Sequence, residues 1–166
     1  MSAVPDFESV LRQLVQSKVR FVLIGGLAMI ARGSANLTRD IDCLYDRDPD
    51  NIERMVDALR GSHPKLRTPG EPVPILWDKD FFKNVLNVTL STDFGPVDLL
   101  AEAPGVAGFE ELWERSQDMV LFGIRVRVAS IDDLIRMKEA TGRTKDSQHA
   151  LQLRALKKIL GGQQPE

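Results

Sequence analysis

Asp40 and Asp42, separated by one apolar residue, are the pair in this sequence whose types and spacing best suit chemistry. Because side chains alternate along a strand, the two carboxylates share one face, roughly 7 Å apart, while Ile41 and Cys43 point into the core. Like charges at that distance repel unless a cation lies between them. Mg²⁺ prefers hard oxygen ligands and is usually held by one or two carboxylates plus substrate phosphates. The other interpretation of an isolated triplet is a solvated strand face with two ordinary aspartates.

Two flanking features favour the metal interpretation. Gly25-Gly26 ends an apolar stretch and opens a helix, where backbone N–H groups can approach a phosphate. A tight strand-to-helix turn needs glycine in any case, so this signal is weak alone. Downstream, Asp98 interrupts an apolar strand, and a charge flanked by core residues is costly unless it is paired or metal-bound. Three inward carboxylates beside such a turn would form a phosphoryl-transfer site with one or two metal ions.

This arrangement resembles the nucleotidyltransferase superfamily with the polymerase-beta-like fold. It is more closely similar to the small bacterial members and to the AbiE-type toxins of toxin–antitoxin systems. Before the aspartates the chain has Gly33, Asn36 and Thr38, so asparagine stands where that family usually has arginine. Lys138, followed by Gly-Arg-Thr-Lys-Asp over 142–146, is similar to a second segment of the family.

The resemblance implies a Mg²⁺-dependent transfer of a nucleoside monophosphate from an NTP to a hydroxyl on RNA or protein, possible in a toxin–antitoxin or stress context. Mn²⁺ is the alternative cofactor, and an antitoxin or other protein is an expected partner. The catalytic and metal-ligating residues would be Asp40, Asp42 and Asp98, with Asp98 also able to take the proton of the attacking hydroxyl. The nucleotide-binding residues would be Gly25, Gly26, Thr38 and Lys138.

The position of Lys138 also follows from spacing. With Ile131, Leu134 and Ile135 it obeys the i, i+3, i+4, i+7 rule, so it lies on the apolar stripe of its helix. Its ammonium then either extends into water along the edge of the core or reaches a β- or γ-phosphate in the site. Asp146 is expected to cap a helix or to pair with a nearby cation.

Other residues with chemical potential have less specific patterns. His63 and His149 lack metal-ligand spacing, and both are expected at the surface. Three aromatic residues near a loop could stack on a base, but such residues more often close a small core: Trp77, Phe81 and Phe82.

The elements that position these residues follow from hydrophobic periodicity and turn signals. The pattern predicts helices over 7–17, 27–32, 49–59, 109–116, 130–141 and 145–160. It predicts strands over 19–24, 39–45, 84–91, 96–102, 120–122 and 124–128, and a loop over 62–74. The fold class is therefore α/β (α+β), with a mixed sheet of about four to six strands flanked by helices and with C-terminal helices.

Composition sets the remaining limits. The 166 residues are 43% hydrophobic, which predicts one globular domain over 1–160, with 161–166 as a flexible tail. No apolar run approaches the ~18 residues of a membrane span, and no signal-peptide pattern is visible at the N-terminus. A single cysteine, Cys43, excludes an internal disulfide and a cysteine zinc site. The expected location is the cytoplasm.

Two other classes of protein remain open. A net charge of −2 argues against a broad electrostatic grip on nucleic acid, although not against a local basic groove. Asn36 and the short chain would also suit a catalytically silent module that binds a nucleotide or a partner. A structural Ca²⁺ domain is less suitable, because no loop has the oxygen-rich spacing that Ca²⁺ prefers.

Overall fold

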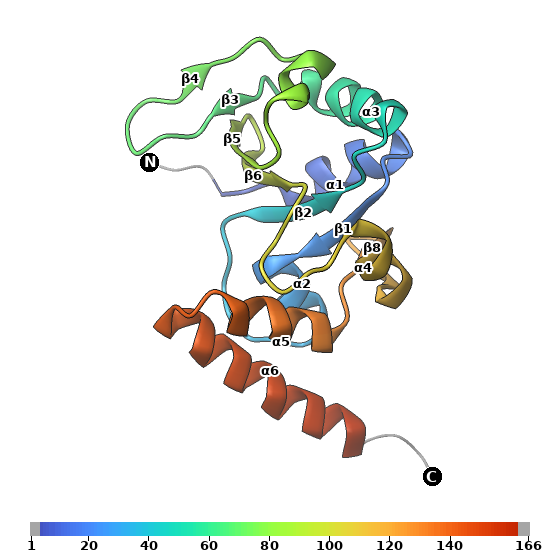
Figure 1. Cartoon of the computed structure of the whole chain (residues 1–166), viewed down its shortest axis with the longest axis vertical. Helices are drawn as coiled ribbons and strands as arrows, with labels where there is room; N and C mark the ends of the chain where they lie inside the picture. Colours follow the sequence, from blue (N-terminus) through green and yellow to red (C-terminus); the bar gives the residue numbers. More distant parts are fainter. Residues whose placement is uncertain (1–3, 163–166) are drawn as a thin grey trace.

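The computed structural model describes residues 4–162, and Figure 1 shows the course of the chain. The helices are α1 (Phe7–Gln16), α2 (Gly25–Ala31), α3 (Pro49–Arg60), α4 (Phe109–Arg115), α5 (Ile131–Ala140) and α6 (Thr144–Gly162), with a 3₁₀ helix η1 (Lys79–Lys83). The strands are β1 (Phe21–Ile24), β2 (Ile41–Tyr45), β3 (Lys65–Leu66), β4 (Val73–Pro74), β5 (Val88–Thr92), β6 (Gly95–Leu100), β7 (Gln117–Leu121) and β8 (Ile124–Val128).

One mixed sheet contains the eight strands of the described residues, in the order β4-β3-β5-β6-β2-β1-β8-β7. At its centre β2 runs antiparallel to β1 and parallel to β6. The predicted α/β class with a mixed sheet is confirmed, and the number of strands is higher than the four to six expected. The buried centre is apolar, as in β1, where all four residues are buried.

The additional strands arise in the segment predicted to be a loop. β3 and β4 pair with each other, and β3 also pairs with β5, so the segment extends the sheet at one edge. Each strand has only two residues, too few to show an alternating pattern, and Pro72 and Pro74 mask the signal further. The prediction of an unstructured loop over 62–74 was therefore wrong in part.

The strand predicted over 84–91 also begins later than expected, at Val88. At this point the Asn87 side chain, rather than the strand backbone, forms the hydrogen bonds to the neighbouring segment. Its Oδ1 accepts from the Ala101 N–H at 2.8 Å, and its Nδ2 donates to the Glu102 carbonyl at 3.0 Å. Side-chain bonds of this kind compete with backbone pairing, which explains why β5 begins only after Asn87, at Val88.

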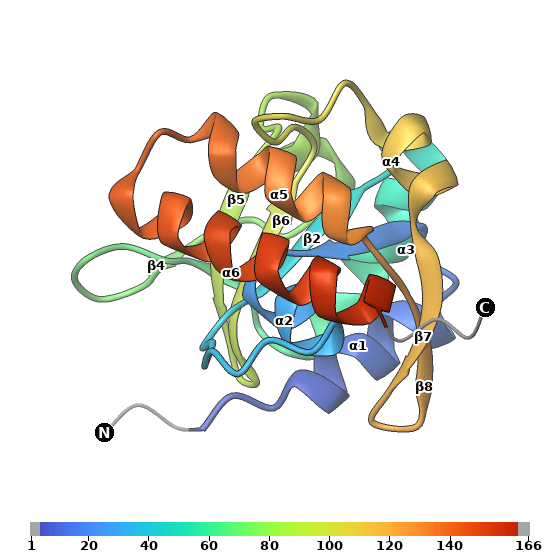
Figure 2. The same ribbon diagram turned by 90° about the horizontal axis from the view of Figure 1, so that it is seen from below.

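The helices lie on both sides of the central strands. In Figure 1, α3 lies above these strands and α5 and α6 lie below them; Figure 2 shows α5 and α6 from below, crossing in front of the sheet. Ser130 opens α5 as predicted, with its Oγ accepting from the Asp133 N–H at 3.1 Å. Neither these helices nor any other in the described residues has the length and hydropathy needed to span a bilayer.

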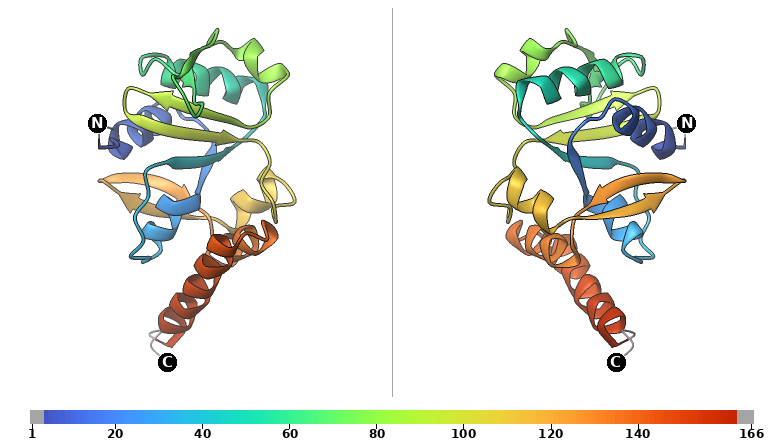
Figure 3. Two further views of the ribbon diagram at one scale, coloured as in Figure 1. Left: turned by 90° about the vertical axis from the view of Figure 1, so that its left-hand side faces the viewer. Right: turned by 90° about the vertical axis from the view of Figure 1, so that its right-hand side faces the viewer.

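The C-terminal helix α6 ends at Gly162, two residues beyond the predicted end. Its C-terminal end projects beyond the body of the fold (Figure 3), while Arg154 and Lys157 still pair with Glu139 and Asp132 of α5. Residues 163–166 of the predicted tail lie outside the described residues.

A small aromatic cluster closes the other end of the core, as the sequence favoured. Phe82 is fully buried and Trp77 is 8% exposed. Their rings meet edge to face with centroids 5.5 Å apart, and the Trp77 indole N–H donates to the Val56 carbonyl at 2.8 Å. These rings therefore contribute to packing rather than to an open surface for a base.

Candidate active site

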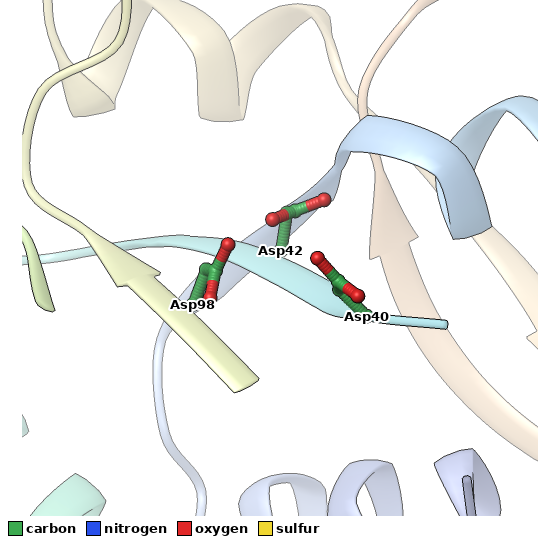
Figure 4. Close-up of side chains that lie close together, drawn as sticks. All are labelled: Asp40, Asp42 and Asp98. Carbon is green, nitrogen blue, oxygen red and sulfur yellow. The ribbon is translucent and has the colours of Figure 1, made fainter. Parts of the chain in front are cut away.

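Three carboxylates, one on β6, one on β2 and one just before β2, meet at the centre of the sheet (Figure 4). Asp42 of β2 and Asp98 of β6 are direct partners in the parallel ladder, and Asp40 precedes β2 on the same face as Asp42. One carboxylate oxygen from each residue lies within 4.8 Å of the others. The structure thus brings together all three aspartates that the sequence singled out; Asp40, Asp42 and Asp98 are called the triad below.

The glycine pair makes room for the triad. Gly25 has φ +68°, and a Cβ built on it would lie 2.0 Å from Asp42 Oδ2. A Cβ on Gly26 would lie 2.6 Å from Thr38 Oγ1. Both residues belong to the first turn of α2, so the helix begins at the glycine pair rather than at Leu27 as predicted. Glycine is required here because Asp42 and Thr38 pack directly against the backbone.

Thr38 and Asn36 lie on the loop that leads into β2. Thr38 Oγ1 is 3.4 Å from the Asp40 N–H and 3.3 Å from the Asp40 carbonyl, which places Thr38 between Gly26 and the triad. Asn36 Nδ2 instead donates to Gln152 Oε1 of α6 at 2.5 Å. The asparagine therefore ties the loop to α6 and does not bond to the triad.

Crowding of negative charge is visible in the pKa of Asp42. Burial and, after it, the neighbouring Asp98 and Asp40 carboxylates together raise this pKa to about 7, against the opposing charge of Lys138. The triad is thus short of positive charge, with hard oxygen atoms close enough to share one ion. These residues fit a divalent cation such as Mg²⁺.

Lys138 lies near the triad but is bonded elsewhere. Its Nζ is 3.1 Å from Asp146 Oδ1, across the turn between α5 and α6, and its side chain is 20% exposed. Asp146 also accepts from Thr141 Oγ1 at 2.7 Å and from Arg143 Nε at 2.6 Å. Asp146 is therefore the ion-pair partner that the sequence suggested, and Lys138 is anchored near Asp42 rather than free in water.

Arg67 is the residue of this site that sequence reasoning missed. Its Nη2 donates to Asp98 Oδ1 at 2.5 Å, and its Nη1 donates to the Leu90 carbonyl at 3.0 Å. It directly follows β3, inside the segment predicted to be a loop. No local pattern marks such a residue, because its approach to Asp98 depends on the pairing of β3 with β5.

The two histidines lie outside the triad. His63 is exposed, as predicted, and its Nδ1 lies 2.6 Å from Asp93 Oδ2. His149 is half-buried rather than at the open surface, and burial and the charge of Lys138 lower its pKa. It packs on the inner side of α6, which the sequence did not predict.

Several solved structures share the fold of this chain. Among solved structures, the lincosamide antibiotic adenylyltransferase LnuA bound to lincomycin is similar with a TM-score of 0.63 and 14% identity, covering 93% of this chain and 99% of that chain. ANT(2″)-Ia in complex with adenylyl-2″-tobramycin gives 0.59 and 14%, covering 93% and 87%. A candidate nucleotidyltransferase from Thermotoga maritima gives 0.57 and 15%, covering 94% and 91%. At these identities the likeness shows the fold.

The sequence comparison shows the family. No curated protein matches the chain. A family described as nucleotidyltransferases of unknown function, DUF6036, matches residues 6–159, which is nearly the whole chain. A fold shared with adenylyltransferases, three converging carboxylates and this match lead to one conclusion: the chain belongs to the DUF6036 family and is a nucleotidyltransferase.

Proposed function

We propose that the protein moves a nucleoside monophosphate from an NTP to an acceptor hydroxyl, with Mg²⁺ as the cofactor and Mn²⁺ as its substitute. The observation that carries the proposal is the triad itself, with oxygens from Asp40, Asp42 and Asp98 within 4.8 Å of one another beside the glycine turn. Carboxylates arranged in this way suit a site that positions phosphates and cancels their charge. We further propose that residues 1–160 act as a single nucleotidyltransferase domain.

Each residue has a defined task in this proposal. Asp40 and Asp42 hold the ion, and Asp98 completes its ligands. The bound ion would neutralise charge on the α-phosphate and on the departing pyrophosphate. The backbone at Gly25 and Gly26 binds the phosphates where no Cβ obstructs them, with Thr38 packed alongside.

Proton transfer depends on Asp98, and the balance of charge at the leaving group depends on Lys138. An Asp98 oxygen takes the proton from the acceptor hydroxyl as its oxygen attacks the α-phosphorus in line with the leaving pyrophosphate. Lys138 is already anchored near Asp42 by Asp146. As a compact point charge it contacts a β- or γ-phosphate and stabilises the leaving group.

RNA or protein is the acceptor that the resemblance to AbiE-type toxins suggests, within a toxin–antitoxin or stress context and with an antitoxin as partner. The similar solved structures LnuA and ANT(2″)-Ia carry lincomycin and an adenylylated tobramycin. A hydroxyl on a small molecule is therefore the alternative acceptor class. The net charge of −2 supplies no general attraction to a large RNA surface.

A catalytically silent module on the same fold is the competing function. Asn36 favours this alternative, because the related families usually have an arginine at that position. In this chain the Asn36 side chain bonds to Gln152. Calorimetry with each Mg·NTP separates two forms of this alternative: a nucleotide-binding module retains NTP affinity without transfer, whereas a partner-binding module shows no NTP affinity.

The test of the proposal is incubation of the pure protein with each α-labelled NTP, Mg²⁺ and three separate acceptor pools: cellular RNA, cellular protein and small metabolites. We expect label in one pool, which identifies both the donor and the acceptor class. Asp40→Asn should abolish that label, and chelation of Mg²⁺ should do the same.

The matched control is Asp57→Asn, which removes an exposed carboxylate on α3 that pairs with Arg60. This variant should transfer label as the wild type does. Label that persists in Asp40→Asn would contradict the role of Asp40, and tight Mg·NTP binding with no label in any pool would favour the silent module.

A further inference from the structure

Among residues 4–162, Arg67 alone forms an ion pair with a carboxylate of the triad. Three contacts fix its position. Its backbone N–H donates to the Thr89 carbonyl at 2.9 Å, its Nη1 to the Leu90 carbonyl at 3.0 Å, and its Nη2 to Asp98 Oδ1 at 2.5 Å. The guanidinium is thus held against the backbone of β5 while it holds a side chain of β6.

This arrangement determines which way the Asp98 carboxylate is turned. One of its oxygens is bound to Arg67, and Figure 4 shows an oxygen of Asp98 directed toward Asp42. Asp42 and Asp98 are direct partners in the ladder, so without a restraint their like charges would favour rotation of Asp98 away from Asp42. The planar guanidinium can bond to the Leu90 carbonyl and to Asp98 at once, which a lysine ammonium cannot do with the same geometry.

We propose that Arg67 is the positioning residue of the triad: it holds one oxygen of Asp98 and thereby keeps the carboxylate turned toward Asp42 and the divalent ion. The inference rests on the proposed function, because it takes the triad to be a metal site. Arg67 acts through Asp98 and needs no contact with the nucleotide.

A positioning role and simple charge repulsion predict opposite effects on metal affinity. If Arg67 acted only as a positive charge beside the ion, its removal would strengthen cation binding. If it orients a ligand, its removal weakens binding, and the loss of residues that orient metal ligands typically costs 10- to 100-fold in affinity. Whether metal affinity falls or rises when Arg67 is removed therefore distinguishes a positioning role from charge repulsion.

The experiment is a titration of the full chain with Mn²⁺ alone, followed by electron paramagnetic resonance, which needs neither NTP nor acceptor. We expect Arg67→Met to weaken Mn²⁺ binding by roughly 10- to 100-fold without a comparable loss of thermal stability. Arg67→Lys should give an intermediate affinity, because it restores the charge but not both hydrogen bonds.

Arg60→Met is the matched control. Arg60 also donates to a backbone carbonyl, that of Trp77 at 2.8 Å, and it pairs with the exposed Asp57 rather than with the triad. This variant should bind Mn²⁺ as the wild type does. Should Arg67→Met fail to fold, Arg67→Lys decides the question, and an affinity equal to that of the wild type overturns the proposal.

Unchanged or tighter Mn²⁺ binding by Arg67→Met overturns the positioning role and leaves the proposed function intact. A wild type that binds Mn²⁺ and NTP but transfers nothing contradicts the proposed function alone. A wild type that binds no Mn²⁺ contradicts both, because the triad would then not be a metal site.

Discussion

Asp42 stands where burial and two neighbouring carboxylates act on one group. Its pKa is raised to about 7, first by burial and then by Asp98 and Asp40. The triad lowers the free energy of unfolding, because the folded chain must keep like charges close together. A bound divalent cation would relieve that cost, which links the stability of the protein to metal binding.

Asp42→Asn is therefore predicted to abolish transfer while stabilising the metal-free fold. In the unfolded chain Asp42 releases its proton near its ordinary value of 3.8, whereas in the fold it keeps the proton to about pH 7. Stability from this group is thus present below pH 3.8 and is lost as pH rises toward 7. In chelator, the variant should unfold at a higher temperature than the wild type at pH 8, with little difference near pH 4.

Thermal unfolding followed by circular dichroism checks this prediction. Addition of Mg²⁺ at pH 8 should raise the melting temperature of the wild type but not that of Asp42→Asn. Asp57→Asn, on the exposed face of α3, should respond to Mg²⁺ as the wild type does. An Asp42→Asn variant that melts below the wild type at pH 8 would argue against charge crowding at the triad.

Gly25→Ala tests the close approach of the backbone to Asp42. A side chain at φ +68° costs roughly 1–2 kcal/mol, and here the new Cβ would also displace Asp42 Oδ2, 2.0 Å away. Gly123→Ala is the matched control, because Gly123 has φ +74° and nothing within 4 Å of a Cβ. Both variants should lose stability in urea unfolding, Gly25→Ala more than Gly123→Ala, but only Gly25→Ala should lose Mn²⁺ affinity. Equal Mn²⁺ affinity in the two variants would mean that Asp42 can shift away from the new Cβ and still bind the ion, which would contradict the prediction.

At the scale of elements, the turn between α5 and α6 is fixed by one buried carboxylate. Asp146 is 3% exposed and accepts from Lys138, Thr141 and Arg143. Burial opposes its ionisation, yet the hydrogen bonds from Thr141, Lys138 and Arg143 outweigh burial and hold its pKa at about 2. The turn therefore keeps Lys138 beside the triad, although Lys138 and Asp146 belong to different helices.

Asp146→Asn should reduce stability by about 2 kcal/mol near neutral pH, from a difference of nearly two pKa units. Because the folded pKa is lowered, this stability is present above pH 3.8 and is lost as pH falls through about 2. Urea unfolding between pH 2 and 7 should show the wild type and the variant converging at the acid end. The control Asp132→Asn breaks only an exposed pair with Lys157 and should cost little. If the two proteins still differed as much in free energy of unfolding at pH 2 as at pH 7, the lowered pKa of Asp146 would not be the cause of the difference.

For the molecule as a whole, local sequence patterns predicted the site residues that are placed by strand alternation or by a glycine turn. They did not predict the residues that reach the site through contacts between distant segments. Asp40 and Asp42 share a face because strands alternate, and Asp98 stood out as a charge in an apolar strand. Arg67 reaches Asp98 only because a two-residue strand joins the edge of the sheet, which has no periodic signal.

The same distinction explains the other residues of the site. Helical spacing placed Lys138 on the inner stripe of α5, but its pairing with Asp146 depends on how α6 turns back across Gly142. The late start of β5 depends on Asn87, whose side chain bonds to a segment more than ten residues away. Such contacts belong to the tertiary fold, so no window of sequence contains them.

The most direct test of the account follows both ends of the nucleotide in one reaction. Wild-type protein, Mg²⁺ and the acceptor pool that takes up label are incubated with the same NTP labelled at the α-phosphate or at the γ-phosphate. We expect α-label on the acceptor and γ-label in pyrophosphate, both absent in Asp42→Asn. Label from the γ-phosphate on the acceptor would instead show phosphoryl transfer and would contradict nucleotidyl transfer at this triad.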